Sequence, residues 1–265
     1  MTPDPAKTMP DIQSSADRRN IPIDRVGVKD VTYPLTLRTR DGASQTTVAK
    51  INMYVSLPHH QKGTHMSRFL EVLNDEAGSS LTPDCFQRIC REIKSRLNAQ
   101  SAHFSADFTY FIRKLAPVTA TPGLMDYQVR FESEANGSDD FIMTVAAPAT
   151  SLCPCSKEIS QYGAHNQRCR IEASVRTRGM IWIEDLVQHL ENAASTQVFA
   201  ALKRPDEKWV TERAYENPKF VEDIVRDLAL SLEADDRVAW FSVNSENYES
   251  IHNHNAYAQL IRDKR

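Results

Sequence analysis

The sequence predicts an α+β fold made of two tandem units of about 110 residues each, with helices on one face of antiparallel sheets. Three observations support this class. Several segments alternate apolar and polar residues with the period of two that a half-buried strand requires. Other segments carry apolar stripes with helical spacing. The order strand, strand, helix, helix, strand, strand then occurs twice along the chain.

The first unit is expected over residues 23–137, after a flexible N-terminal tail of residues 1–22 that lacks an apolar signal sequence. Two strands open this unit, one around residues 31–37 and one over 46–57, each with apolar side chains on one face. Two helices are expected over 66–77 and within 79–98. Thr82 can cap the second helix, and Pro83 suits its first turn. Strands over 103–115 and 125–134 complete the unit.

The second unit is expected over residues 138–265 and repeats this order. Strands are predicted over 140–149 and 168–179 from their alternating apolar residues. A helical stripe follows over 183–190, and Asn217-Pro218 is expected to open a second helix that continues to Leu232. Strands over 237–246 and 255–264 close the unit.

The composition is that of a soluble globular protein, since 41% of residues are hydrophobic and 25% are charged. A formal net charge of −3 argues against broad binding to nucleic acid, and no apolar run is long enough for a membrane helix. Five cysteines, an odd number, follow an N-terminus without a secretion signal. This indicates a cytoplasmic protein whose thiols serve metal binding or catalysis rather than disulfides.

The link from Ser151 to Gln167 is much longer than a hairpin turn, and long loops on rigid scaffolds often carry function. It holds Cys153 and Cys155, with His165 twelve residues after Cys153. A closed zinc site would need four Cys or His ligands, commonly in CxxC pairs, and the chain has no such pair. From spacing alone, metal binding and a chance gathering of polar residues are equally good interpretations.

A third metal ligand would have to come from another part of the chain. Glu207 is predicted to lie in the connection between the two helices of the second unit, and Glu249 and His252 lie where the last two strands meet. Each of these residues, taken alone, is more simply a solvated surface group. Three protein ligands would leave one coordination position open, as catalytic metal sites do. The remaining cysteines lie on predicted apolar faces and are expected to be buried thiols: Cys85, Cys90 and Cys169.

Cationic and hydroxyl side chains gather just before the first predicted helix. Helix N-termini attract anions, and Lys and Arg add charge-assisted hydrogen bonds to phosphate. Both a phosphate-binding segment and an ordinary polar turn are compatible with this pattern. The residues concerned are His59, His60, Lys62, Thr64, His65, Ser67 and Arg68.

Four stretches together resemble the type IB GTP cyclohydrolases of bacteria and archaea. They are KGTHMSRF, PCSKEISQYGAHNQR, KFVED and ESIHNHNA, in that family's chain order, and the similarity extends from about Asn20 to the C-terminus. The resemblance implies the tunnelling fold, in which ββααββ units assemble into barrels with the helices outside. It also implies two units per subunit and a homotetramer with its active sites at subunit interfaces. The implied reaction converts GTP and water to 7,8-dihydroneopterin triphosphate and formate, the first step of tetrahydrofolate biosynthesis.

The resemblance further implies a metal site. Cys153, His165 and Glu207 match the family's metal ligands. One divalent metal ion per active site is then expected. A thiolate, an imidazole and a carboxylate form a mixed donor set, which is compatible with manganese, zinc or ferrous iron.

Other residues match the family's substrate and catalytic positions. Glu222, in KFVED, matches the acid that binds the edge of guanine. Glu249 and His252 match the catalytic pair near the metal, and Cys155 matches a second active-site thiol. The resemblance assigns the triphosphate to a set of cationic and polar residues: Lys62, His65, Ser67 and Arg68, with Arg168 and Lys203 as further candidates.

Two other functions remain open at this stage. One is a related tunnelling-fold enzyme, an NADPH-dependent nitrile reductase with a cysteine nucleophile. The KFVED acid suits both enzymes, whereas the Cys153, His165 and Glu207 set and the ESIH stretch suit only the cyclohydrolase. The other is a non-catalytic oligomer that binds purines or pterins and is held together by a metal ion.

Overall fold

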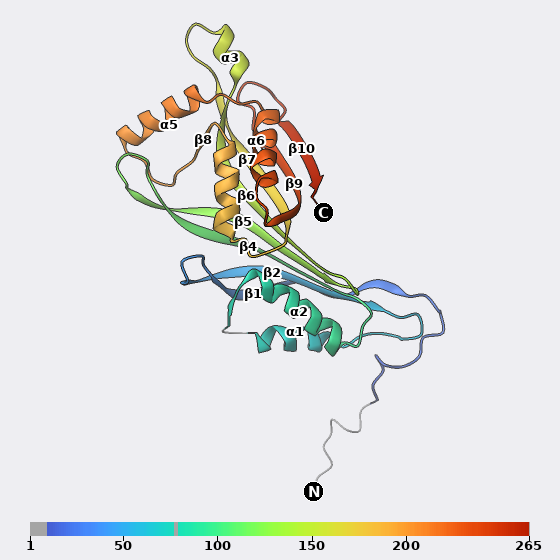
Figure 1. Ribbon diagram of the computed structural model, residues 1–265. Helices are drawn as coiled ribbons and strands as arrows, with labels where there is room; N and C mark the ends of the chain where they lie inside the picture. Colours follow the sequence, from blue (N-terminus) through green and yellow to red (C-terminus); the bar gives the residue numbers. More distant parts are fainter. Residues whose placement is uncertain (1–9, 77–78, 265) are drawn as a thin grey trace.

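A computed structural model describes residues 10–76 and 79–264. Within these residues, one ten-stranded sheet runs through the whole molecule in the order β10-β9-β7-β6-β5-β4-β2-β1-β3, with β8 paired to β6 (Figure 1). All of its strand pairs are antiparallel except the short pair of β1 and β3. The predicted α+β class with antiparallel strands is therefore confirmed. Parts of the expected tail (1–9), of the first expected helix (77) and of the last residues (265) lie outside the described residues.

The first half of the chain follows the expected order, with one short strand added. Its strands and helices are β1 (Ile23–Arg38), β2 (Ser44–Leu57), α1 (Met66–Asp75), β3 (Ser80–Leu81), α2 (Pro83–Arg96), β4 (Ala102–Leu115) and β5 (Pro122–Ala135). Thr82 occupies the N-cap of α2 and Pro83 its first turn, as expected, although the Thr82 side chain makes no capping hydrogen bond.

The second half repeats the order and adds a short strand, β8, and two helices, α3 and α5. Its elements are β6 (Asp139–Leu152), α3 (Pro154–Ile159), β7 (Asn166–Thr177), α4 (Ile183–Ala193), β8 (Thr196–Gln197), α5 (Arg204–Glu216), α6 (Val221–Glu233), β9 (Val238–Asn247) and β10 (Ala256–Asp263).

Two predictions in this half were wrong. Glu207 lies in the first turn of α5 and not in an irregular connection, because Pro205 and the capping carboxylate of Asp206 start a helix there. Asn217 ends α5 instead of opening α6. The later helix begins at Val221, where the Asp223 carboxylate accepts a hydrogen bond from the backbone amide that precedes the helix.

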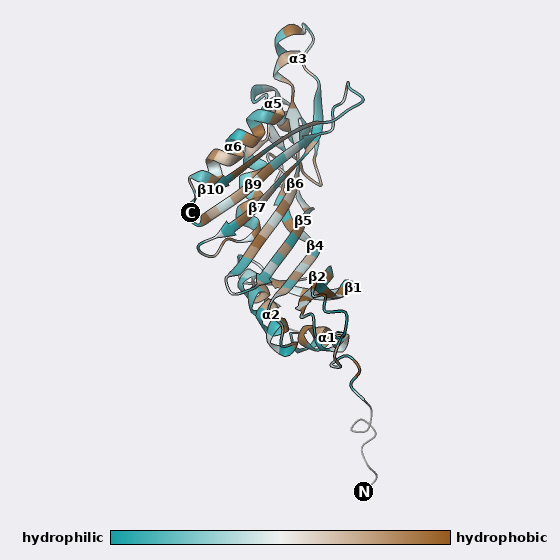
Figure 2. Cartoon of the chain, turned by 90° about the vertical axis from the view of Figure 1, so that its right-hand side faces the viewer, coloured by the Kyte–Doolittle hydropathy of each residue, from teal (hydrophilic) through white to brown (hydrophobic). Residues whose placement is uncertain are grey.

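The helices α1, α2, α4 and α6 pack on one face of the sheet, as expected. Helix α2 lies on β4, β5 and β6, α4 on β6 and β7, and α6 on β9 and β10. Figure 2 shows apolar and polar residues alternating along the strands. The apolar set faces the helices: in β2, Ala49, Ile51 and Met53 are fully buried. The core is therefore the layer between the sheet and these four helices.

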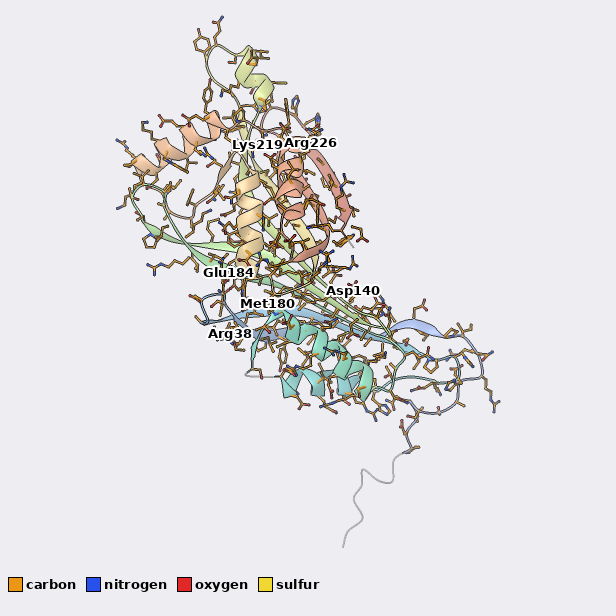
Figure 3. The ribbon with its side chains drawn as sticks, viewed as in Figure 1. Arg38, Asp140, Met180, Glu184, Lys219 and Arg226 are labelled. Atoms are coloured by element: carbon orange, nitrogen blue, oxygen red, sulfur yellow. The ribbon has the colours of Figure 1, made fainter. Side chains whose placement is uncertain are left out.

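The two halves are joined by the β5–β6 pair and by polar contacts at the N-terminal end of α4. In the β1–β2 turn, the Arg40 amide donates to Glu184 at 3.1 Å, and the Arg40 guanidinium pairs with Asp185 at 2.8 Å. Tyr110, from β4, donates to the same Glu184 carboxylate at 2.7 Å. Figure 3 places Glu184 at the end of α4 that faces the first half.

Part of the segment that was expected to be a flexible tail is hydrogen-bonded to the loop after β2. The Asp17 amide donates to the His60 carbonyl at 2.9 Å, and the Lys62 amide donates to the Ser15 carbonyl at 3.0 Å. The segment is held in this way because its backbone groups find partners on the loop. Among the helices of residues 10–76 and 79–264, none combines the length and the apolar character needed to cross a membrane.

Candidate active site

The β6–β7 hairpin brings Cys153 and His165 together. Leu152 and Asn166 are the last paired residues of the two strands, so Cys153 and His165 come next on either side. The Cys153 amide donates to the His165 carbonyl at 3.1 Å. Two candidate metal ligands that are twelve residues apart in the sequence are therefore neighbours in space, and α3 and the rest of the loop extend beyond them (Figure 1).

The surroundings of both side chains suit metal binding. The Cys153 sulfur accepts a hydrogen bond from the Ser156 amide at 3.5 Å. His165 Nδ1 lies 3.1 Å from the side-chain oxygen of Gln167 and 3.3 Å from the hydroxyl of Ser250. When Nδ1–H donates to Gln167, Nε2 carries the free lone pair that a metal ion requires. Both side chains are half-buried, so they remain accessible to a ligand.

Glu207 of the same chain does not lie beside this pair. Helix α3 contacts the other end of α5, where Lys157 Nζ donates to the Tyr215 carbonyl at 2.6 Å. Glu207 precedes Tyr215 by eight residues, which corresponds to about 12 Å along a helix. Among the residues that the structure describes, no three His, Cys, Asp or Glu side chains form a group that could hold a metal ion. The exposed Glu207 carboxylate has no hydrogen bond or ion pair with a described residue.

The loop between β9 and β10 carries Glu249 and His252 to the same end of the molecule. The Tyr248 amide donates to the Arg168 carbonyl at 3.0 Å, and the Ser250 hydroxyl contacts His165. Glu249 is half-buried, whereas His252 is exposed. The His252 ring stacks on His254, with centroids 5.1 Å apart. The predicted catalytic pair thus lies on a loop that is anchored directly beside the imidazole of the predicted metal site.

Glu222 and Cys155 also lie at this end. The chain before α6 is fixed to the end of β6, because the Lys219 amide donates to the Leu152 carbonyl and the Ser151 hydroxyl donates to the Lys219 carbonyl, both at 3.0 Å. Figure 3 shows Lys219 at the end of α6 nearest to α3. Glu222 follows in the first turn of α6 and is exposed. Cys155, in α3, is exposed as well.

The predicted triphosphate residues lie elsewhere. They belong to α1 and the segment before it, at the opposite end of the molecule from α3 (Figures 1 and 2). His65 and Arg68 line a cavity of about 280 Å³, and Lys62 and Ser67 do not. His65 Nε2 lies 3.0 Å from a carboxylate oxygen of Asp11. The structure therefore brings only half of the predicted set to one cavity, and it separates the whole set from Cys153 in the same chain.

The other two triphosphate candidates lie apart from α1 as well as from each other. Arg168 is exposed at the start of β7, beside the loop that carries Glu249. Lys203 is the N-cap residue of α5.

Sequence reasoning missed three residues that support this site. Gln167 and Ser250 orient the His165 ring. Gln167 follows His165 by two residues and nothing in the local sequence marks it, whereas Ser250 reaches the ring only because the β9–β10 loop meets the hairpin in space. Asp206, beside Glu207, is fully buried. Asp206 comes directly after Pro205 and three residues after Lys203, the N-cap of α5. A proline followed by an acidic residue in the first turn is a typical helix start, and this signal could have identified Asp206.

Comparisons with known proteins identify the family. A family model described as type I GTP cyclohydrolase FolE2 matches residues 9–258. The protein named GTP cyclohydrolase FolE2 of Geobacter sulfurreducens is 53% identical, over 97% of this chain and 99% of its own. The protein of the same name from Nitrosococcus oceani is also 53% identical, over 96% of this chain and 95% of its own.

A solved structure supports the fold. The uricase of Arthrobacter globiformis superimposes with a TM-score of 0.53 at 8% identity, covering 91% of this chain and 93% of that one. At this identity the likeness concerns the fold alone, and it confirms the expected tunnelling fold. With the family model matched over nearly the whole sequence, the chain belongs to the type I GTP cyclohydrolase FolE2 family.

Proposed function

We propose that this protein is a metal-dependent GTP cyclohydrolase that converts GTP and water to 7,8-dihydroneopterin triphosphate and formate, in tetrahydrofolate biosynthesis and in the cytoplasm. Its membership of the FolE2 family supports the reaction. The structural observation that carries the proposal is the hairpin that sets the Cys153 thiol beside the His165 imidazole, whose Nδ1 is held by Gln167. This arrangement is of the kind that catalytic metal sites use to orient a histidine ligand.

In this proposal Cys153, His165 and Glu207 hold one divalent ion, which is manganese, zinc or ferrous iron. The bound ion supplies Lewis acidity, so that water can attack C8 of guanine at neutral pH. Cys153 and His165 come from one copy of the chain, and Glu207 comes from a second copy. The separation of Glu207 from the pair within one chain supports this division.

The exposed surface around Glu207 also supports a partner subunit. Four large apolar side chains of the β4–β5 hairpin and α5 are exposed to solvent in the single chain: Leu115 (53%), Val118 (53%), Leu124 (61%) and Trp209 (41%). Clusters of exposed apolar side chains commonly mark protein interfaces. We propose that a second copy covers them in a homotetramer, whose sheets close into barrels and whose active sites lie between subunits.

The remaining residues have roles that follow from their chemistry. The exposed carboxylate of Glu222 can accept two N–H bonds from the edge of guanine, and adenine lacks this pair of donors. His252, with Glu249 beside it in the loop, can donate a proton to the purine nitrogen as the ring opens. Cys155, which is exposed on α3, is the second thiol of the proposed active site. His65, Arg68, Lys62 and Ser67 of another subunit bind the triphosphate.

The test is an assay of the full-length protein with GTP after a chelator has removed bound metal. Manganese, zinc or ferrous iron is then added back, and the dihydroneopterin product is followed by its absorbance. We expect Cys153→Ala to lose both stoichiometric metal and turnover, whereas Cys85→Ala, a change of the same kind at a half-buried thiol of α2, keeps both. Absence of turnover with any of the three metals, or full metal content in Cys153→Ala, would contradict the proposal.

A further inference from the structure

We propose that Asp206 is a positioning residue for the metal site: it fixes the first turn of α5 to the β4–β5 turn and thereby sets the place of Glu207. This inference rests on the proposed function, in which Glu207 is a metal ligand. It concerns a residue that does not touch the metal or the substrate.

Helix α5 has little apolar packing to hold it in place. Of its thirteen residues, only Asp206 and Ala214 are fully buried. Ala214 is near the C-terminal end, which is also held by Asn217, whose side chain donates to the carbonyls of Ala194 and Ser195 at 3.1 and 3.0 Å. The N-terminal end, where Glu207 lies, therefore depends on Asp206 for its attachment to the rest of the molecule.

The Asp206 carboxylate is fully buried and accepts four hydrogen bonds. One oxygen accepts from the backbone amides of Val118 and Thr119, at 2.9 and 2.8 Å. The other accepts from the Thr119 hydroxyl at 2.7 Å and from the Lys203 amide at 2.9 Å. A buried charge without enough partners is costly, and these four donors satisfy the carboxylate without a cation. Three of the four donors belong to the β4–β5 turn, which is distant in sequence.

Helix capping alone does not account for this arrangement. Asp185 and Asp223 occupy the same position in α4 and α6, and each accepts a hydrogen bond from the backbone amide that precedes its helix. Their further contacts are with arginine side chains. Only Asp206 among these three capping residues binds the backbone of another element. The additional bonds fix the direction of α5 as well as its start.

The Glu207 carboxylate is held in place only through the helix that carries it. Its exposed side chain has no partner among the described residues, so the position of the carboxylate depends on the first turn of α5. A carboxylate that binds zinc must reach a bond length of about 2.0–2.2 Å, which tolerates little displacement. Residues that orient metal ligands typically change metal affinity by about 10- to 100-fold when they are replaced.

The experiment measures manganese binding to the full-length protein by isothermal titration calorimetry. Asp206→Asn replaces one carboxylate oxygen with an NH2 group, which cannot accept the hydrogen bonds that this oxygen accepts in the wild type. We therefore expect the Kd for manganese to rise about 10- to 100-fold. Thr119→Val removes one of the four bonds and keeps the side-chain volume, so a smaller rise is expected while the fold is retained. Glu212→Gln, the same kind of change at an exposed acid of α5, should leave the Kd unchanged.

A double-mutant cycle separates positioning from a general loss of stability. In a Glu207→Gln background, Asp206→Asn should weaken manganese binding no further, because the ligand that it positions is absent. Wild-type affinity in both Asp206→Asn and Thr119→Val, or an equal loss in the Glu207→Gln background, would overturn the inference and leave the proposed function intact. If the wild-type protein bound no manganese, zinc or ferrous iron, the proposed function would fail, and this inference with it.

Discussion

At the scale of single residues, the five cysteines differ because their surroundings differ. Cys90 lies on the buried face of α2, where its thiol donates to the carbonyls of Ala102 and Ser133 at 3.3 and 3.4 Å. Burial raises the pKa of Cys90 and of Cys169 to about 12. These two were correctly predicted to be buried, whereas Cys85 is only half-buried. Cys155 is exposed on α3, so the thiols divide into an inert pair and an accessible set.

This division predicts the pattern of chemical labelling. Iodoacetamide should modify Cys155 in the native, metal-free protein at mildly alkaline pH, and it should leave Cys90 and Cys169 unmodified, because the thiolate is the reactive form. Peptide mass spectrometry after brief labelling measures this directly. In denaturant all five cysteines should react, which serves as the control. Modification of Cys90 as fast as that of Cys155 would contradict the burial described above.

At the scale of secondary-structure elements, short polar contacts fix where helices end and how they join strands. The turn between α6 and β9 is one example. The Asp235 carboxylate accepts from the Arg237 guanidinium at 2.7 and 3.0 Å and from the Arg237 amide at 3.0 Å. His189 of α4 lies 3.5 Å away. Chiefly because of the Arg237 side chain, the pKa of Asp235 falls from 3.8 to about 2.

This lowered pKa predicts a pH dependence of stability. The folded-state pKa lies below the value of 3.8 for an unperturbed carboxyl, so the stabilising contribution is complete above about pH 4 and is lost as the pH falls toward 2. Asp235→Asn should therefore be less stable than the wild type at neutral pH, and the difference should shrink through that acidic window. Urea unfolding at a series of pH values measures it. Asp236→Asn, which removes a carboxylate at the exposed neighbouring residue, is the matched control.

At the scale of the whole molecule, the predicted site residues divide into separate groups. Cys153, His165, Glu222 and the β9–β10 loop lie at the α3 end. Glu207 lies at the N-terminal end of α5, whereas α3 contacts the C-terminal end of that helix, and the triphosphate set lies beside α1. Because one sheet spans the chain, these groups cannot meet by a small movement within a subunit. Under the proposed function, each active site therefore takes residues from more than one copy.

Subunit complementation tests this arrangement. Cys153→Ala and Glu207→Ala should each be inactive with GTP. When the two variants are co-expressed with different affinity tags and the hybrid oligomers are isolated, activity should return in part. If the two residues come from different subunits, random assembly leaves about a quarter of the sites with both residues intact. Hybrids as inactive as the parent variants would indicate that both ligands come from the same chain.

Much of the fold could be predicted from the sequence because its signals are local. In β2, the alternation of Ala49, Ile51 and Met53 with polar residues reflects one buried face, and the structure buries all three. The stripe of α2 is equally clear, and Phe86 and Ile89 are buried on it. Helix α5 escaped prediction because it has no apolar stripe: it is held by hydrogen bonds at its two ends.

By itself, the sequence determined the class of fold, the repeated order of elements and the family, since each of these depends on periodicity or on motifs. Only the tertiary structure decided that Asp206 fastens α5 to the β4–β5 turn, that Ser250 reaches His165, and that Glu207 lies apart from the other two predicted ligands of its own chain. The physical reason is that these relations join segments far apart in the sequence, and side-chain hydrogen bonds and distances between such segments leave no periodic pattern in the residues that make them.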